Sequence, residues 1–235
     1  MTSVITAMRL AKLQRDAVDH IKRHALTLSL RSRRAQAYIL TEYLWIEETT
    51  ESAPLRDGVA GYGDRAPWLA KLITAQLADE HRHAELLRGR LAELGTAPRP
   101  APRLARAKLW WLERATARYT GAFAAGPIVT LLAAAAQFEA TGVRILERHL
   151  AVLERRPDDP LTAIVRSILA DERRHAKSCA AAALRLVRTD EQRAFDELRA
   201  RIAGIDRAFG VTIAVRFWML VAALAAADRL AKESV

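Results

Sequence analysis

Several residue types are scarce in this 235-residue chain, and each shortage excludes a class of protein. A single cysteine, Cys179, cannot form an intramolecular disulfide framework. Ten glycines and eight prolines are few and clustered, which favours helix over strand. No Gly-x-Gly-x-x-Gly motif follows an expected strand, so no flavin or nicotinamide site is indicated. Alanine, leucine, arginine and glutamate dominate instead, and we expect an almost all-α, soluble protein.

Targeting signals are also missing. The N-terminus lacks a basic stretch followed by an apolar run and a cleavage site, so we expect a cytoplasmic protein. Residues 209–227 are apolar, but Arg216 lies inside them, and Asp228 and Arg229 follow directly. A membrane span needs about 20 apolar residues with few charges. We therefore expect no transmembrane span and interpret this segment as a helix packed on the protein or in a subunit interface, which leaves a homodimer open.

The chain has fewer acidic than basic residues. The formal net charge is +10 and the sequence pI about 10.4, so attraction to polyanions or anionic surfaces is physically reasonable. The arginines are scattered through expected helices rather than gathered in one tail. A solvated, arginine-rich surface is the simplest interpretation.

Apolar periodicity, together with the positions of proline and glycine, divides the chain into helices. We predict them at residues 4–28, 32–51, 67–94, 104–120, from Gly126-Pro127 to about 155, and 160–188, then a short helix after Thr189 and the apolar segment 209–227. Three prolines between 98 and 102 place an extended linker at about 95–103. We expect a single domain, 1–235, with repeat one at about 35–94, repeat two at about 127–188, and C-terminal helices over 189–233.

The two repeats are visible as a self-match. After a shift of 92 positions, QLADEHRHA at 76–84 aligns with ILADERRHA at 168–176, so each copy carries Glu-x-x-His. The same shift aligns Glu47 with Glu139. Glu42 and Glu48 align with alanines, so the register selects Glu47. Glu51, one turn after Glu47, stays open as an alternate ligand.

Glutamate and histidine three residues apart project from one face of a helix, so both can bind one ion. A single such motif is usually a surface pair, but two copies with matched upstream glutamates in apolar helices need another explanation. Buried carboxylates are costly unless they are paired or bind a cation. Carboxylates with one imidazole per ion suit iron or manganese. The predicted ligands are Glu47, Glu80, His83, Glu139, Glu172 and His175.

Both copies read Asp-Glu-x-Arg-His, which resembles the (D/E)ExRH motif of oxygen-activating diiron enzymes of the ferritin-like superfamily. The resemblance implies a four-helix bundle of two helix-pair repeats, with additional N-terminal, crossover and C-terminal helices. It also implies two iron ions, or a Mn/Fe or Mn/Mn pair, bridged by Glu80 and Glu172. His83, His175, Glu47 and Glu139 would be terminal ligands, and Asp79 and Asp171 would accept the second ring N–H of a ligand histidine.

The resemblance implies a non-haem diiron oxidase or oxygenase that uses O2 to hydroxylate or desaturate an organic substrate, with electrons from a separate reductase. Three alternatives stay open. The basic charge is compatible with a tRNA-modifying diiron hydroxylase, whose phosphate contacts would come from Arg99, Arg103, Arg106 and Lys108. A ferritin-like or rubrerythrin-like ferroxidase or peroxide scavenger, without a Cys-x-x-Cys domain, is the second. A non-enzymatic, metal-stabilised binding protein is the third.

The repeats differ beside the glutamates. Tyr43 and Leu44 of the first repeat align with Ala135 and Ala136, and Thr50 with Gly142. Small residues leave room for a ligand, so Ala135, Ala136 and Gly142 are a candidate substrate pocket, with close helix packing as the alternative. Gly142→Leu is then expected to block turnover and spare metal content. Tyr43, one turn before Glu47, is a candidate redox-active or hydrogen-bonding residue, with a core tyrosine as the alternative.

Overall fold

A computed structural model describes residues 2–51, 57, 60, 62, 66–100, 102–156 and 159–233, and every regular element in them is helical. In chain order the α-helices are α1 (Thr2–Ser29), α2 (Arg33–Glu51), α4 (Pro67–Glu93), α5 (Arg103–Thr116), α6 (Ile128–Leu153), α7 (Pro160–Leu186) and α8 (Gln192–Glu233), with short 3-10 turns at Ala117–Tyr119 and Thr189–Glu191. The all-α prediction is confirmed, and most helix ends lie within a few residues of those expected.

Local chemistry explains these ends. Pro67 and Pro160 occupy the first turns of α4 and α7, where the missing N–H costs nothing. Asp159 caps α7, because its carboxylate accepts a hydrogen bond from the Leu161 backbone N–H at 2.9 Å. Gly95 ends α4 with a φ of 66°, a left-handed conformation that glycine adopts without steric cost.

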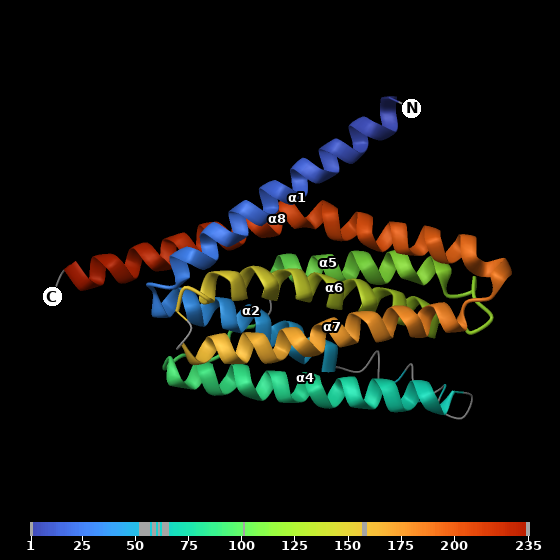
Figure 1. Ribbon diagram of the computed structural model, residues 1–235, viewed down its shortest axis with the longest axis horizontal. Coiled ribbons are helices and arrows are strands. Elements are labelled where there is room, and N and C mark those ends of the chain that lie inside the picture. The colour runs from blue at the N-terminus through green and yellow to red at the C-terminus, as the bar shows by residue number, and fades with distance from the viewer. Residues whose placement is uncertain are drawn as a thin grey trace.

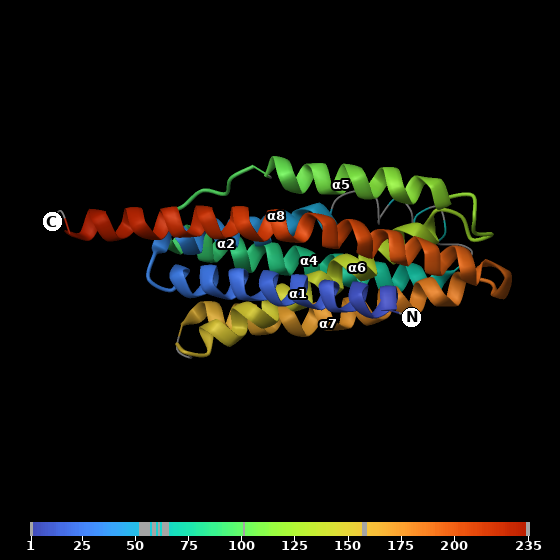
Figure 2. The same cartoon turned by 90° about the horizontal axis from the view of Figure 1, so that it is seen from above.

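Two antiparallel helix pairs form the centre of the molecule: α2 packs with α4, and α6 packs with α7 (Figure 1). Contacts between α4 and α7 join the pairs. The apolar core lies between these four helices and includes the fully buried Leu40, Leu69, Leu87, Leu132 and Ile168. Figure 2 shows α8 between α1 and α5, and α8 contacts both of these helices.

The C-terminal region differs from the prediction of a short helix followed by a separate apolar segment. It forms one helix, α8, of 42 residues, which is on the order of 60 Å long. No proline interrupts this stretch, and the glycines at 204 and 210 weaken a helix without breaking it. Burial of Ala214 and Val221 and a 2.7 Å hydrogen bond from Ser32 Oγ to Asp228 Oδ2 hold α8 along the bundle.

Two helical stretches are long and apolar enough to cross a membrane by length and composition alone. One is α6, whose apolar window is 39% buried within the protein; the other is Thr189–Glu233, whose window is 11% buried. The burial of α6 is that of a core helix, since this helix lies inside the four-helix centre. The apolar window of Thr189–Glu233, in contrast, is mostly exposed on the protein surface.

Candidate metal centre

Four helices bring the six predicted ligands into one buried cluster. Glu47 comes from α2, Glu139 from α6, and the two Glu-x-x-His motifs come from α4 and α7; each of the six residues is at most 6% exposed. Their ligand atoms form two groups, each within 4.8 Å of one another: Glu47, Glu80, His83 and Glu172 in one, and Glu80, Glu139, Glu172 and His175 in the other. Glu80 and Glu172 belong to both groups. The cluster thus has the form of two adjoining cation sites with two shared carboxylates.

The histidines direct their Nδ1 atoms into this cluster. The three-residue spacing places each imidazole one turn beyond a glutamate of its own helix. His83 Nδ1 lies 3.2 Å from Glu47 Oε2, and His175 Nδ1 lies 3.1 Å from Glu80 Oε1. Both imidazoles are almost fully buried. Each group therefore contains one imidazole nitrogen among carboxylate oxygens.

The opposite nitrogen of each imidazole meets an aspartate of the other repeat. His83 Nε2 lies 3.1 Å from Asp171 Oδ2, and His175 Nε2 lies 3.2 Å from Asp79 Oδ2. An ionised carboxylate only accepts, so the imidazoles donate Nε2–H to the aspartates. This leaves the Nδ1 lone pair of a neutral imidazole facing the cluster, as metal ligation requires. The two aspartates were expected from the sequence, but the exchange between repeats was not.

Two arginines tie the aspartates together, and the sequence interpretation gave them no role. Arg82 pairs with Asp171 and, at 3.1 Å, with Asp79; Arg174 pairs with Asp171 at 2.7 Å and also with Asp79. Burial by itself raises the pKa of Asp171, but Arg82, His83 and Arg174 lower it to about 2. The pKa of Asp79 is lowered in the same way. Both arginines recur in the self-match, which was the signal that could have identified them.

The clustered glutamates are electrostatically strained without a cation. Burial, followed by repulsion from neighbouring carboxylates, raises the pKa of Glu47 and Glu139 well above the usual range. Burial raises the pKa of Glu172 to about 7. Burial also raises the pKa of Glu80, but His175, Glu47 and His83 together outweigh it and the net direction is downward. The four carboxylates can all be ionised together only if bound cations compensate their charge.

The donor set fits a pair of first-row divalent ions. Glu80 Oε1 and His175 Nδ1 are buried and form no hydrogen bond within the described part of the chain, although they lie 3.1 Å apart. Because these two atoms face one another without hydrogen-bond geometry, both are placed to bind the same cation. Carboxylate oxygens and one imidazole per ion suit iron or manganese better than a thiolate-bound structural zinc.

One end of the cluster carries a polar chain that the repeat could not reveal. Gln76 Nε2 donates to Glu139 Oε1 at 2.7 Å, and Cys179 Sγ donates to Gln76 Oε1 at 3.2 Å. The self-match places an isoleucine, Ile168, opposite Gln76, so no repeated pattern marks this residue. Burial raises the pKa of the Cys179 thiol, which stays protonated and acts as a donor. Gln76 therefore holds the Glu139 carboxylate in position, and among the described residues no amide side chain donates to Glu47.

Tyr43 is buried, and its hydroxyl lies 3.1 Å from Nδ1 of His149, a buried α6 residue that sequence analysis did not single out. Burial raises the pKa of Tyr43 and lowers that of His149 to about 4, so both groups are neutral at neutral pH. The hydrogen-bonding partner of Tyr43 is thus another core residue. A redox role for Tyr43 stays a prediction.

The candidate substrate pocket is tightly packed at two of its three positions. Ala135 lies in the apolar core and is 4% exposed. Ala136 is half-buried and packs against the same apolar core. A Cβ at Gly142 would lie 2.6 Å from Glu172 Oε2. Gly142 therefore makes space for a carboxylate of the cluster, so this contact favours loss of metal in Gly142→Leu, in contrast to the expectation from the sequence.

Three other candidates have partners outside the cluster. Glu42 lies near Arg216 at 3.8 Å, and Glu48 pairs with Arg88 at 2.7 Å. The side chain of Glu51 is outside the described residues. Lys108, expected among the phosphate contacts, forms an ion pair with Asp206.

Comparison of the chain with protein-family models, with curated proteins and with solved structures finds no match. The case for function accordingly rests on the buried cluster itself.

Proposed function

We propose that this protein is a ferritin-like, non-haem diiron oxidase or oxygenase that oxidises an organic substrate with O2. The observation that carries the proposal is the pair of buried ligand groups that share Glu80 and Glu172, each completed by one imidazole and one further glutamate. Helix bundles in which two helices each give a Glu and two each give Glu-x-x-His are the ligand set of ferritin-like dinuclear proteins. Two iron ions held there would supply the reduction of O2, with electrons from an external donor.

The residues around the ions have definite tasks. Asp79 and Asp171 keep the proton on Nε2 of each histidine, so that Nδ1 stays a ligand. Glu47 and Glu139, whose pKa values are raised by burial, exchange protons as the charge of the site changes. Gln76 donates to Glu139 and restricts its movement. The apolar core around the cluster excludes water that would compete for the site.

The test begins with metal analysis of protein produced with both iron and manganese available. We expect two ions per chain, and the double variant Glu80→Gln/Glu172→Gln should lose both, because these residues belong to both groups. Anaerobic Fe(II) protein is then mixed with limiting O2 and followed by absorbance and O2 consumption. Rapid O2 consumption at a fixed ratio to iron, with a short-lived absorption band, supports an oxidase or oxygenase.

A matched control is Glu85→Gln on α4, since this glutamate is exposed and pairs only with Arg88 among the described residues. It should retain both ions and the reaction with O2. Growth of an iron core beyond two ions per chain would instead identify iron storage. Full metal loading without O2 consumption would leave a metal-stabilised binding protein.

A further inference from the structure

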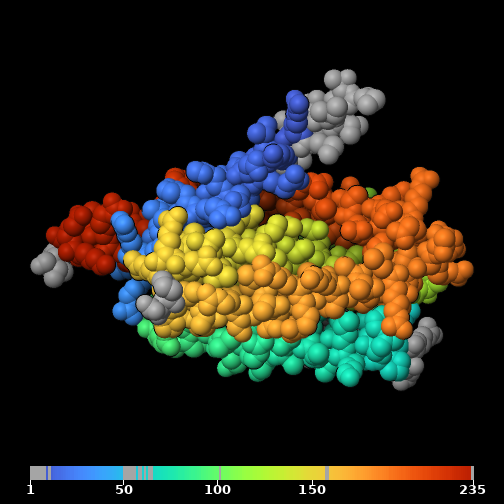
Figure 3. Space-filling model, viewed as in Figure 1, coloured from blue at the N-terminus to red at the C-terminus, as the bar shows by residue number. Residues whose placement is uncertain are grey.

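Exposed apolar side chains gather on one layer of the molecule, which consists of α1, α5 and α8 and is called the outer layer below. Among the described residues, eleven large hydrophobic side chains are exposed, and nine belong to this layer: Leu13, Trp110, Trp111, Val211, Val215, Trp218, Met219, Leu220 and Leu230. Figure 3 shows α8 and α1 on the outside of the bundle, above α6 and α7. Exposed apolar side chains concentrated in one part of a protein mark an interaction site.

The apolar surface follows α8 in a regular stripe. Val211, Val215, Trp218 and Ala222 recur at alternating spacings of four and three residues and therefore lie on one side of the helix. Met219, beside the stripe, is 59% exposed. Arg216 is the only charged residue between 208 and 227, and it points to the cavity described below. The stripe thus offers about three helical turns of uncharged surface.

Positive charge concentrates on the same layer. The helices α1, α5 and α8 contain sixteen lysines and arginines against eight aspartates and glutamates, and so carry +8 of the formal net charge of +10. Arg103 and Arg106 are exposed on α5, and the guanidinium of Arg114 lies 5.6 Å from the ring centre of Trp110. The four helices that hold the metal cluster contribute little to the net charge.

We propose that the outer layer is a peripheral membrane-binding surface that docks on an anionic lipid bilayer, with α8 lying in the interfacial plane. An apolar stripe flanked by arginines and half-exposed tryptophans has the chemistry of a helix that rests at the headgroup level. Each basic residue near such a surface adds to the attraction for anionic headgroups. Contacts of α8 with Ser32, Tyr38 and Lys108 keep it along the bundle, so the helix lies on the bilayer and does not cross it.

Charge distinguishes a bilayer from the other occupants. A second copy of the chain would bring one +8 layer against another, which is unfavourable where the surfaces meet. A nucleic acid would satisfy the arginines but leave the aliphatic stripe of α8 against phosphates and water. An anionic bilayer matches both the apolar stripe and the charge.

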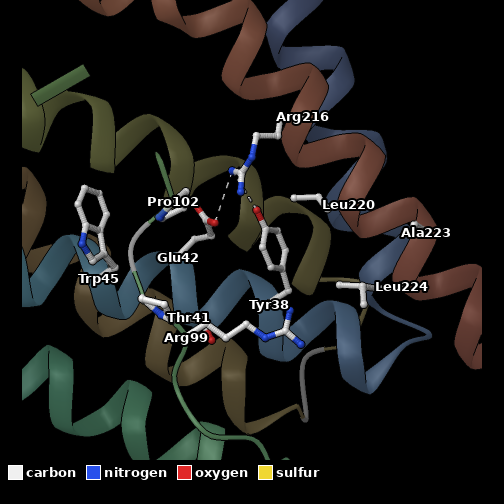
Figure 4. Close-up of a pocket in the computed structure, with 11 residues that line it drawn as sticks. Tyr38, Thr41, Glu42, Trp45, Arg99, Pro102, Arg216, Leu220, Ala223 and Leu224 are labelled. Carbon is white, nitrogen blue, oxygen red and sulfur yellow. Dashed lines mark hydrogen bonds and ion pairs between the residues drawn. The ribbon is translucent and has the colours of Figure 1, made fainter. Parts of the chain in front are cut away.

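A cavity at the edge of the outer layer fits a lipid headgroup. It has a volume of about 370 Å³ and lies between α2, the 99–102 linker and α8. In Figure 4, Arg216 points toward Glu42 and Tyr38, at 3.8 and 3.4 Å. Arg99, which also lines the cavity, forms no ion pair among the described residues. The guanidinium groups of Arg99 and Arg216 are incompletely neutralised and lie beside apolar side chains. The same proposal therefore assigns this cavity to the phosphate of a lipid headgroup.

The test is co-sedimentation of the full, metal-loaded chain with vesicles of phosphatidylcholine, with and without phosphatidylglycerol. We expect binding to the anionic vesicles, weakened by salt, and little binding to neutral ones. Val215→Glu/Met219→Glu should reduce the affinity at least about tenfold by placing two anions at the bilayer surface. Arg103→Glu/Arg106→Glu should reduce it similarly, and Arg99→Ala should reduce it less. Inorganic phosphate should not compete for the surface as a whole.

Matched controls lie on α7, outside the outer layer. Leu184→Glu changes a side chain that is 50% exposed, and Arg166→Glu reverses an exposed arginine with no ion pair among the described residues; both should bind as the natural chain does. Unchanged metal content and helical signal show that each variant is folded. A second measurement needs no variant: brominated anionic lipids should quench part of the tryptophan fluorescence of the natural chain.

Four results would overturn the proposal: no binding to anionic vesicles; equal binding by Val215→Glu/Met219→Glu; a dimer in solution that these substitutions dissociate; or preferential binding of duplex RNA that displaces vesicles. The dimer would assign the stripe to a second copy, and the RNA result would assign the layer to a nucleic acid. Vesicle binding does not depend on the reaction with O2, so this proposal and the proposed function can fail separately.

Discussion

At the scale of single residues, each specified position of the Asp-Glu-x-Arg-His pattern has a defined partner in the structure. Glutamate and histidine face the cluster, while aspartate and arginine form a polar network behind it. Each histidine is oriented by an aspartate from the other repeat. The network is partly exposed, and its aspartates are ionised, as the pKa of about 2 for Asp171 indicates.

Asp171→Asn is expected to weaken metal binding about 10–100-fold, because the amide no longer accepts the Nε2–H of His83 as a charged group does. Titration of metal-free protein with Fe(II) or Mn(II) measures this. Asp196→Asn on α8, an exposed position, is the control. An unchanged affinity in the Asp171 variant would show that the aspartate only adds solubility.

Gly142→Ala is expected to lower metal content and stability, because its Cβ would lie 2.6 Å from Glu172 Oε2. Gly89→Ala on α4 is the matched control, since its Cβ would meet no atom within 4 Å. The control should be neutral or more stable by about 1 kcal/mol, the helix propensity difference. Metal analysis and thermal unfolding of both variants separate a local clash from a general effect of alanine.

His149 predicts a pH dependence of stability. Burial lowers its pKa from 6.5 to about 4, so the unfolded chain binds this proton first as the pH falls. The stabilisation is complete above pH 6.5 and is lost as the pH falls toward 4, by on the order of 3 kcal/mol. Denaturant unfolding of the metal-free protein against that of His149→Gln measures it: the pH slope in this window should flatten in the variant. Equal slopes would assign the acid sensitivity to other groups.

At the scale of helices, one carboxylate links the crossover helix α5 to two other helices. Asp206 of α8 pairs with Lys108 of α5 and accepts hydrogen bonds from Gln137 and Thr141 of α6, each at 3.2 Å. It therefore joins three helices at a site where few waters could replace the contacts. Burial by itself raises the pKa of Asp206, but Lys108 and its other partners lower it.

Asp206→Asn should lower the free energy of unfolding by about 2–3 kcal/mol, since it leaves Lys108 without its anion. Hydrogen exchange should increase most in α5. For the natural carboxylate the contribution is present above pH 3.8 and is lost as the pH falls through its lower folded pKa. Stability equal to that of the natural chain would show that solvent compensates the lost pair.

The helices and the cluster were predictable to different degrees. Capping residues and prolines placed most helix ends, and the register of the self-match selected Glu47 over Glu42, which the structure places beside Arg216. The single long α8 was not predicted, because its apolar segment was interpreted separately from the charged one before it. Gln76 was not predicted because only one repeat carries it, and contacts such as Tyr43 with His149 depend on helices brought together by tertiary packing.

At the scale of the whole molecule, the metal cluster connects all four central helices. The number of bound cations should therefore determine the free energy of unfolding of the whole protein. Ligands that bind only the folded state stabilise it by about 2.7 kcal/mol at a hundredfold excess over Kd. Removing the ions with a chelator should therefore lower Tm by at least about 5 °C.

Metal affinity should also fall below about pH 7, where protons occupy Glu172 and its neighbours. Calorimetry with and without Fe(II) or Mn(II) checks both.

The exchange of aspartates between repeats has an implication for the origin of the chain. Asp79 serves His175, and Asp171 serves His83, so neither helix pair can complete the surroundings of its own histidine. A shorter ancestor with a single helix pair could have formed this network only as a symmetric homodimer. Gene duplication and fusion would then have freed the two copies to diverge, and Gln76 opposite Ile168 is one position where they did.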